Sequence, residues 1–226
     1  LDTSSATPDS GSFSALSGAT NAISVTVTDL AGNTSSAATG NIEVDITPPG
    51  AASLAATETQ GSLINAAEET SGVAVVATLA GTNAVAGDTI ELLLDGSAFS
   101  TPIIHVLTAA EVTAGSYTFT VSTGLLGAEG AKSLTTVVTD AVGNVGAASP
   151  ALALTLDTTA PGAAVISTTA TNNTSPTISG TAEANSSVTV TVGGATYSVT
   201  ADGSGNWELD TSSATPDSGS FSALSG

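Results

Sequence analysis

Apolar and polar residues alternate along several short stretches of the chain. Apolar side chains occupy every second position at Ile23, Val25 and Val27, at Tyr117, Phe119 and Val121, at Leu152, Leu154 and Leu156, at Val188, Val190 and Val192, and at Tyr197, Val199 and Ala201. A period of two predicts β-strands with one buried face. Gly, Asn, Asp and Pro separate the stretches, and short strands at this spacing are typical of β-sandwiches. The pattern therefore predicts an all-β chain.

Three further residues or stretches fit this class. Residues 107–115, LTAAEVTAG, are expected to form one helical turn, which is too short to change the class. Trp207 follows a Gly-Asn turn and stands alone among few aromatic residues, so we expect a core side chain on a strand rather than a ligand platform. His105 lies in the apolar stretch PIIHVL and is expected to be a core or edge side chain.

The chain repeats itself on two scales. Residues 1–18 and 209–226 are the same sequence, LDTSSATPDSGSFSALSG. Residues 23–52 also correspond to residues 134–164, and both segments contain the pattern T-D-x-x-G-N followed by D-x-T-x-P-G-A-A. These features predict a tandem array of domains, of which the chain contains two copies of one half-domain.

The repeats divide the chain into three parts. We expect residues 1–46 to be the C-terminal half of one domain, residues 47–157 a complete domain, and residues 158–226 the N-terminal half of the next copy. The linkers ITPPG and TTAPG contain proline, which favours extended and semi-rigid backbone between domains.

The charge of the chain is strongly one-sided. It has 20 acidic residues but one Lys or Arg residue, Lys132, and one His, for a formal net charge of −19. This balance excludes nucleic acid and anionic membranes as partners, since both require basic patches. The chain has no Cys, and no apolar run approaches the length of a membrane-spanning helix. A divalent cation that neutralises some carboxylates is one expectation, and a uniformly acidic surface that keeps the chain soluble is the alternative.

Several stretches resemble the bacterial immunoglobulin-like tandem extender repeats of giant RTX-type surface adhesins. They are SPTISGTAEANSSVTVTVGG, TYSVTADGSGNWEL, ISVTVTDLAGNTS, LINAAEETSGVAVVATLAG and the linkers DITPPG and DTTAPG. The resemblance implies tandem immunoglobulin-like β-sandwich domains in an extended array. It further implies an extracellular stalk on a Gram-negative cell, with Ca²⁺ at the module junctions and a role in cell adhesion and biofilm formation.

An immunoglobulin-like topology predicts where carboxylates would gather. At each junction it brings together the linker Asp, the Asp of T-D-x-x-G-N and the loop between the second and third strands. The first junction would join Asp45, Asp140 and the loop 81–88, through Asp88 or Asn83. The next would join Asp157, Glu183 and the equivalent of Asp29 from a following copy. Such oxygen donors suit calcium. In the alternative, Asp29 and Asp140 cap their turns.

No catalytic motif accompanies these patterns, so we expect a structural protein rather than an enzyme. A glycan- or protein-binding module is one alternative, although aromatic residues for sugar stacking are few. Neighbouring repeats of the same protein are the expected partners. In a further alternative the two terminal half-domains complete each other between chains, by head-to-tail self-association. One of the two identical eighteen-residue segments would then be displaced.

Overall fold

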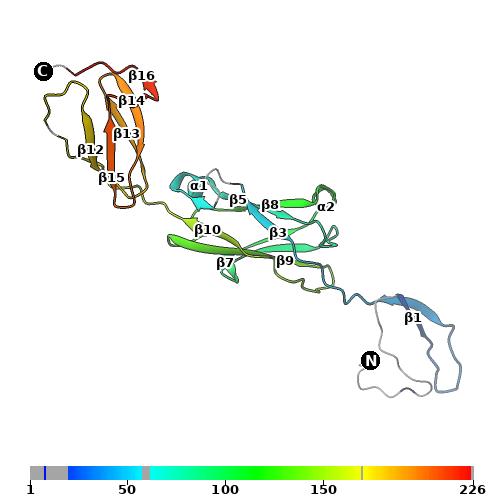
Figure 1. The fold of residues 1–226 in the computed structure, drawn as a ribbon. Helices are drawn as coiled ribbons and strands as arrows, with labels where there is room; N and C mark the ends of the chain where they lie inside the picture. The colour runs from blue at the N-terminus through cyan, green and yellow to red at the C-terminus, as the bar shows by residue number, and fades with distance from the viewer. Residues whose placement is uncertain (1–7, 9–19, 58–61, 169, 225–226) are drawn as a thin grey trace. The chain divides into compact units, whose positions relative to one another are not determined.

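The computed structural model describes residue 8 and residues 20–57, 62–168 and 170–224. It forms two compact units, residues 1–158 and residues 159–226 (Figure 1). The predicted all-β class is confirmed by the described strands. The finer division at residue 46 stays a prediction, and the expected displacement within residues 1–18 concerns a segment that lies almost wholly outside the described residues.

The first unit begins with a two-stranded hairpin and continues as a sandwich. Its strands are β1 (Thr20–Val25), β2 (Ala38–Glu43), β3 (Ser53–Ala56), β4 (Leu63–Ile64), β5 (Val73–Thr78), β6 (Thr89–Leu94), β7 (Ser97–Val106), β8 (Ser116–Val121), β9 (Gly130–Thr139) and β10 (Leu152–Leu156), and its helices are α1 (Ala66–Ser71) and α2 (Ala109–Ala114). Strands β1 and β2 are antiparallel, with Ile23 opposite Gly40.

Two sheets enclose the core of the sandwich. One has the strand order β3-β5-β8 and the other the order β4-β10-β9-β6-β7 (Figure 1). Inward-facing side chains from both sheets meet in one cluster: Val73, Val75, Phe119, Ile90, Leu92, Leu134, Val138, Leu154 and Leu156. The alternating pattern of β8 and β10 is therefore explained by burial of every second side chain. We call residues 47–158 the middle sandwich.

Each short helix has a capping box at its N-terminus. In α2, the turn expected from LTAAEVTAG, Thr108 and Glu111 satisfy each other's backbone N–H groups. In α1, Asn65 and Glu68 do the same. Helix α1 was not among the elements predicted from the sequence, although the spacing of Asn65 and Glu68 is typical of a helix start.

The second unit contains two three-stranded sheets. Its strands are β11 (Val165–Ile166), β12 (Thr177–Thr181), β13 (Ser187–Val192), β14 (Ala195–Thr200), β15 (Asn206–Asp210) and β16 (Ser218–Gly219), in the orders β11-β12-β15 and β13-β14-β16. Trp207 lies on β15 and is buried, as expected for a core aromatic residue. Its indole rests against Gly180, where an added Cβ would lie 2.6 Å from Trp207 Cζ2.

The chain has two basic side chains, Lys132 and His105, and both lie in the middle sandwich. Lys132 is in β9, opposite Leu154 of β10. His105 is on the edge strand β7, where its ring stacks on Tyr117 with centroids 4.0 Å apart. Its Nε2 also lies 2.9 Å from Glu111 Oε2. The ring stack connects β7 with β8 of the other sheet, and the contact with Glu111 connects β7 with α2. Among the described residues, no helix combines the length and apolar character needed to cross a membrane.

Candidate functional site

The segment that enters the middle sandwich is held by its backbone. Asp45 Oδ1 accepts a hydrogen bond of 2.9 Å from Thr47 N, which fixes a local turn. Further along, Gly50 N donates to Thr82 O at 2.7 Å, in the loop between β5 and β6. A Cβ at Gly50 would lie 2.9 Å from Gly81 O, so this close approach requires glycine. The linker and the loop therefore pack directly against each other.

The turn after β9 supplies the second part of the site. Asp140 Oδ1 accepts hydrogen bonds from Val142 N at 3.0 Å and Asn144 N at 2.8 Å, and its Oδ2 accepts one from Asn144 Nδ2 at 2.7 Å. Partial burial raises the pKa of Asp140, but these hydrogen bonds favour the carboxylate and leave the pKa below its ordinary value. Asp140 is therefore a stable anion within its turn.

Within the described residues, the same turn occurs at three places. Asp29 with Asn33 and Asp202 with Asn206 repeat the backbone bond from Asp N to Asn O and the bond from Asn N to the carboxylate. Their pKa values are likewise lowered, first of all by hydrogen bonds from the Asn residue. These are the bonds of a turn cap, which was the alternative for Asp29 and Asp140. Asp202 was not predicted as a residue of this kind, although it stands in the same D-x-x-G-N spacing.

Asn144 connects this turn to the linker. Its Nδ2 donates both to Asp140 Oδ2 and, at 3.0 Å, to the backbone oxygen of Asp45. Two residues later, Gly146 N donates to Val138 O at 2.8 Å. A Cβ at Gly146 would lie 2.5 Å from Pro49 O, so glycine lets the two segments pass closely. The linker is thus bound on one side by the loop and on the other by the turn.

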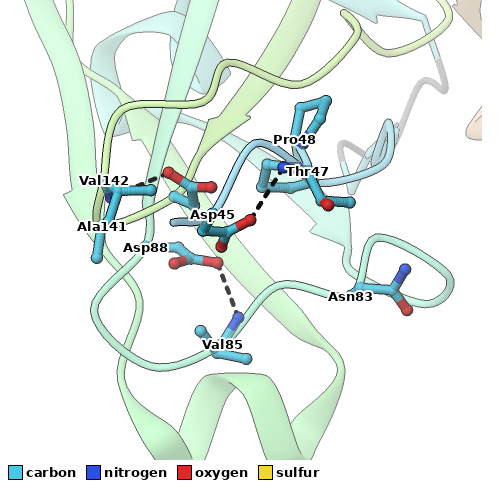
Figure 2. A pocket seen from close by; sticks show the side chains of 10 residues that line it. Asp45, Thr47, Pro48, Asn83, Val85, Asp88, Ala141 and Val142 are labelled. Carbon is cyan, nitrogen blue, oxygen red and sulfur yellow. Dashed lines mark hydrogen bonds between the residues drawn. The ribbon is translucent and has the colours of Figure 1, made fainter. Parts of the chain in front are cut away.

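Asp88 is the buried carboxylate of the site. It is 2% exposed, and its Oδ2 accepts a hydrogen bond of 2.9 Å from Val85 N. Its Oδ1 is buried without a hydrogen-bond partner. An unpartnered buried carboxylate oxygen is costly, and such an atom commonly marks a place for an ion or a water molecule. Figure 2 shows the Asp88 and Asp45 carboxylates facing the same space.

Three carboxylates predicted for the first junction line one cavity. Asp45, Asp88 and Asp140 border a cavity of about 310 Å³ together with Thr47 and Asn83. Asn83 lies at its edge and points away from the carboxylates in Figure 2, so Asp88 rather than Asn83 is the donor that the loop offers. The linker, the loop and the turn converge here from three separate parts of the sequence.

The side chains that line the cavity offer the type of ligand atom that a hard cation prefers. Every polar side-chain atom that Asp45, Asp88 and Asp140 present is a carboxylate oxygen, and no basic side chain lines the cavity. Calcium takes about 6–8 such oxygen ligands, including backbone carbonyls. Within the described part of the chain, however, no three His, Cys, Asp or Glu side chains are already grouped closely enough to hold a metal ion. A bound cation would therefore have to draw the carboxylates together.

The other predicted ligands lie elsewhere. Asp157 follows β10, and its N donates to Ile64 O at 2.9 Å. Glu183 is an exposed residue between β12 and β13 in the second unit, and its backbone oxygen accepts a bond of 2.7 Å from Ser186 Oγ. Asp29 is exposed at the turn of the β1–β2 hairpin. These three residues thus belong to three different parts of the described chain.

Comparison with protein families finds a match within the second unit. Residues 164–224 match the family model of the bacterial Ig-like domain. This segment is therefore similar to bacterial Ig-like domains. A comparison with curated protein sequences finds no match. The bacterial Ig-like family is associated with structural modules rather than with catalysis.

Several solved structures are similar to this chain. One is a Ca²⁺-stabilized adhesin with which an Antarctic bacterium binds ice (26% identity, 84% of this chain and 48% of that one, TM-score 0.40). Another is a 1.5-MDa bacterial ice-binding adhesin (24% identity, 84% and 63%, TM-score 0.36). A third is an immunoglobulin-like domain of the M. primoryensis ice-binding adhesin (25% identity, 49% and 100%, TM-score 0.34). The present chain spans about half the length of the first of these structures.

Proposed function

We propose that this chain is a segment of an extracellular stalk, built from tandem bacterial Ig-like modules that hold the adhesive part of a cell-surface adhesin away from the cell. Its contribution to adhesion and biofilm formation is mechanical and not catalytic. The family match of residues 164–224 and the repeated half-domains within the sequence support this proposal. The neighbours of each module are then other repeats of the same protein.

The junction before the middle sandwich would supply the stiffness. The observation that carries the proposal is the cavity of Asp45, Asp88 and Asp140, in which Asp88 Oδ1 is buried and unpartnered. Calcium held by these three carboxylates would neutralise their charge and join the linker to the loop and the turn of the sandwich. The bonds from Gly50 N to Thr82 O and from Asn144 Nδ2 to Asp45 O already limit movement of the linker.

Thermal unfolding tests the proposed calcium site. A ligand that binds only the folded state stabilises it by about 2.7 kcal/mol at a concentration one hundred times its Kd. We therefore expect the Tm of the middle sandwich to rise by several degrees in millimolar calcium relative to chelator, and magnesium serves as the ion control. Asp88→Asn keeps an acceptor for Val85 N but loses charge, and should abolish the rise.

A matched pair of variants separates calcium binding from turn capping. Asp140→Asn and Asp202→Asn weaken the same D-x-x-G-N turn, but only Asp140 shares a cavity with Asp45 and Asp88. We expect Asp140→Asn to remove the calcium response and Asp202→Asn to retain it. An unchanged Tm of the wild-type chain in calcium, or equal responses of the two variants, would contradict a calcium site.

A second candidate function is self-assembly into a matrix filament by complementation of half-domains between chains. The strand order of the second unit favours it, because β13 is an edge strand among the described residues. Proteins commonly blunt or cover such edges, since an unpaired strand edge is a template for another strand.

A further inference from the structure

An early strand and the last strand of the middle sandwich pair directly with each other. Strand β4 lies beside β10, with Leu63 opposite Thr155 and Ile64 opposite Leu156. Among the strand pairs of the described residues this pair alone is parallel, because the others are antiparallel. Since β4 comes soon after the entering linker and β10 directly precedes the leaving one, the pair links the two ends of the module.

Backbone hydrogen bonds tie β4 to β10 at both ends of the pair. Thr155 N donates to Ser62 O at 2.8 Å, and Asp157 N donates to Ile64 O at 2.9 Å. The first bond reaches the residue before β4, and the second starts from the residue after β10. The contact between the two segments is therefore longer than the two residues of β4.

Buried side chains reinforce these bonds. Ile64 is 1% exposed and Leu156 is 3% exposed, and both belong to the core cluster of the middle sandwich. If β4 slid along β10, Ile64 would leave a close-packed core at the same time as the backbone bonds broke. Packing and hydrogen bonding therefore resist the same movement.

The segment that precedes β4 belongs to the other sheet. Strand β3 is antiparallel to β5, with Ser53 opposite Thr78 and Ala56 opposite Val75. Strand β4 then lies in the sheet of β10. The chain thus changes sheets between β3 and β4, so both sheets hold the part of the module that follows the entering linker.

Both strands of the pair are also anchored where they end. After β4, Asn65 caps helix α1, and the backbone oxygen of Thr70 at the other end of this helix accepts a hydrogen bond of 3.0 Å from Thr123 Oγ1. After β10, Thr158 N and Oγ1 donate to Glu129 Oε1 at 2.9 Å and 2.6 Å. These contacts fix the two strands to different loops of the sandwich.

The chain enters and leaves the middle sandwich at opposite ends of β9. The entering linker lies beside Asn144, which follows the C-terminal end of β9, and Leu156 at the end of β10 lies opposite Gly130 at the N-terminal end of β9. Strand β9 has ten residues and so spans about 33 Å. Tension on the two linkers therefore acts along the length of the strands.

Tension of this kind pulls β4 and β10 in opposite directions. Strand β10 runs toward the end of the sandwich that contains Gly130, and β4 runs the same way because the two strands are parallel. A pull on the entering linker draws β4 backward along its own axis, and a pull on the leaving linker draws β10 forward. The hydrogen bonds lie across this direction, so they must break together rather than one after another.

Every route to an extended module must break this pair. Unravelling from the entering linker frees β3 from β5 and then reaches β4, whereas unravelling from the leaving linker must free β10 from both β9 and β4. Detachment of β3 alone releases only the short segment before β4. The contact between β4 and β10 is therefore common to both routes.

We propose that the parallel pair β4–β10 is the mechanical clamp of the middle sandwich, the contact whose rupture allows the module to extend under tension. The proposal rests on the stalk function described above, because a stalk is the kind of structure that bears such tension. It does not involve the calcium site, since none of Asp45, Asp88 and Asp140 belongs to either strand.

Unfolding at constant force tests the clamp in the full chain. The chain has no native Cys, so handles can be attached at Ile46→Cys and Ala160→Cys, two exposed positions on either side of the middle sandwich. Chelator is present throughout. A substitution raises the unfolding rate when the interactions it removes are already lost in the transition state, so the rates of variants identify the contact that breaks.

Two buried isoleucines provide a matched pair of variants. Ile64 in β4 and Ile90 in β6 are 1% and 0% exposed. We expect Ile64→Ala to raise the unfolding rate under force about tenfold or more, and Ile90→Ala to change it less than about twofold. Both variants should lower the Tm by similar amounts in the absence of force. If either Ala variant does not fold, Ile64→Val and Ile90→Val replace them.

A second pair of variants distinguishes β4–β10 from β3–β5. Thr155→Pro removes the donor to Ser62 O, and Thr57→Pro removes a comparable donor to β5 just after β3. We expect only Thr155→Pro to shorten the lifetime of the folded module under force. Equal rates for the Ala variants of Ile64 and Ile90, or a larger effect of Thr57→Pro, overturns the proposal.

The same measurements separate the clamp from the calcium junction of the proposed function. If the wild-type Tm does not rise in calcium, the junction fails, but the difference between Ile64→Ala and Ile90→Ala remains because it is measured in chelator. Conversely, equal rates for these two variants would leave the rise of the Tm in calcium intact. Failure of one proposal is therefore visible without failure of the other.

Discussion

The side chain of Asn144 donates a hydrogen bond of 3.0 Å to the backbone oxygen of Asp45, across 99 residues of sequence. Asp45 belongs to the segment that enters the middle sandwich, and Asn144 closes the turn between β9 and the segment leading to β10. The turn residue therefore has two roles, because the same Nδ2 also donates to Asp140 Oδ2. A bond of this kind couples the direction of the incoming chain to the fold of the module it enters.

Replacing Asn144 by Ala should loosen the linker. The variant loses a bond to Asp45 and one to Asp140, and each such bond contributes about 1 kcal/mol to the free energy of unfolding. Hydrogen exchange should be faster at Gly50 N, whose bond to Thr82 O joins the same linker to the loop between β5 and β6. Asn206→Ala is the control, since it alters the same turn in the second unit. Unchanged exchange at Gly50 in Asn144→Ala would contradict this coupling.

Acid should destabilise the α2 region of the middle sandwich through Glu111. Hydrogen bonds from Thr108 and His105 lower the pKa of Glu111 from its ordinary value of 4.5 to about 2. Because the folded pKa lies below the unfolded one, this contribution is fully present above about pH 4.5 and is lost as the pH falls toward about 2.

The Tm measured across that pH range tests the assignment. Glu111→Gln cannot gain or lose a proton at this position, so its Tm should fall less steeply with acid than that of the wild-type chain. The Tm of this variant should still fall somewhat with decreasing pH, because Asp140 and Asp202 also have lowered pKa values. Identical slopes for the two proteins would show that Glu111 does not contribute.

Burial should decide the effect of the same substitution at two equivalent positions. Val138 is 1% exposed and its counterpart Val27 is 69% exposed. Val138→Ala should lower the free energy of unfolding of the middle sandwich by about 2 kcal/mol, through lost apolar burial and a small cavity. Val27→Ala should change the stability of the dilute chain by less than about 0.5 kcal/mol. Denaturant titration measures both, and equal losses would contradict the difference in burial.

Gly180→Ala should displace Trp207. The added Cβ would lie 2.6 Å from Trp207 Cζ2 and would also approach Val165 O, so the indole or strand β11 must move. Overpacking of this kind costs about 1–3 kcal/mol. Trp207 is the single Trp of the chain, so its fluorescence should shift toward that of an exposed indole. Gly203→Ala is the control, because nothing lies within 4 Å of its added Cβ.

Local sequence patterns predicted the strands because each strand carries its own period of two. Leu152, Leu154 and Leu156 lie in β10, and Tyr117, Phe119 and Val121 lie in β8, as expected. The same pattern in Ile23 and Val25 predicted a strand but could not predict its exposure. Burial depends on which other strand lies opposite, and alternation within one strand contains no information about its neighbours.

The candidate site was also predictable only in part. Topology predicted that Asp45, Asp88 and Asp140 would converge, and these three residues line one cavity. It could not predict how the carboxylates are used, because a turn cap and a metal ligand both require an acidic oxygen. The structure assigns three turn bonds to Asp140 and leaves one buried oxygen of Asp88 without a partner. Burial of Asp88 depends on the fold of the loop, which the sequence alone does not specify.

Lys132 has a consequence for resistance to proteases. It is the single Lys or Arg of the chain, so a trypsin-like protease has one bond to cut, that between Lys132 and Ser133. That bond lies within β9: Lys132 is opposite Leu154, and Ser133 accepts a backbone bond from Asp95 N and donates one to Asp95 Oδ1. A protease needs an extended, unpaired segment, so cleavage must wait for β9 to leave its sheet. The folded chain therefore presents almost nothing to such digestive enzymes, and its cutting rate would record how often the middle sandwich opens.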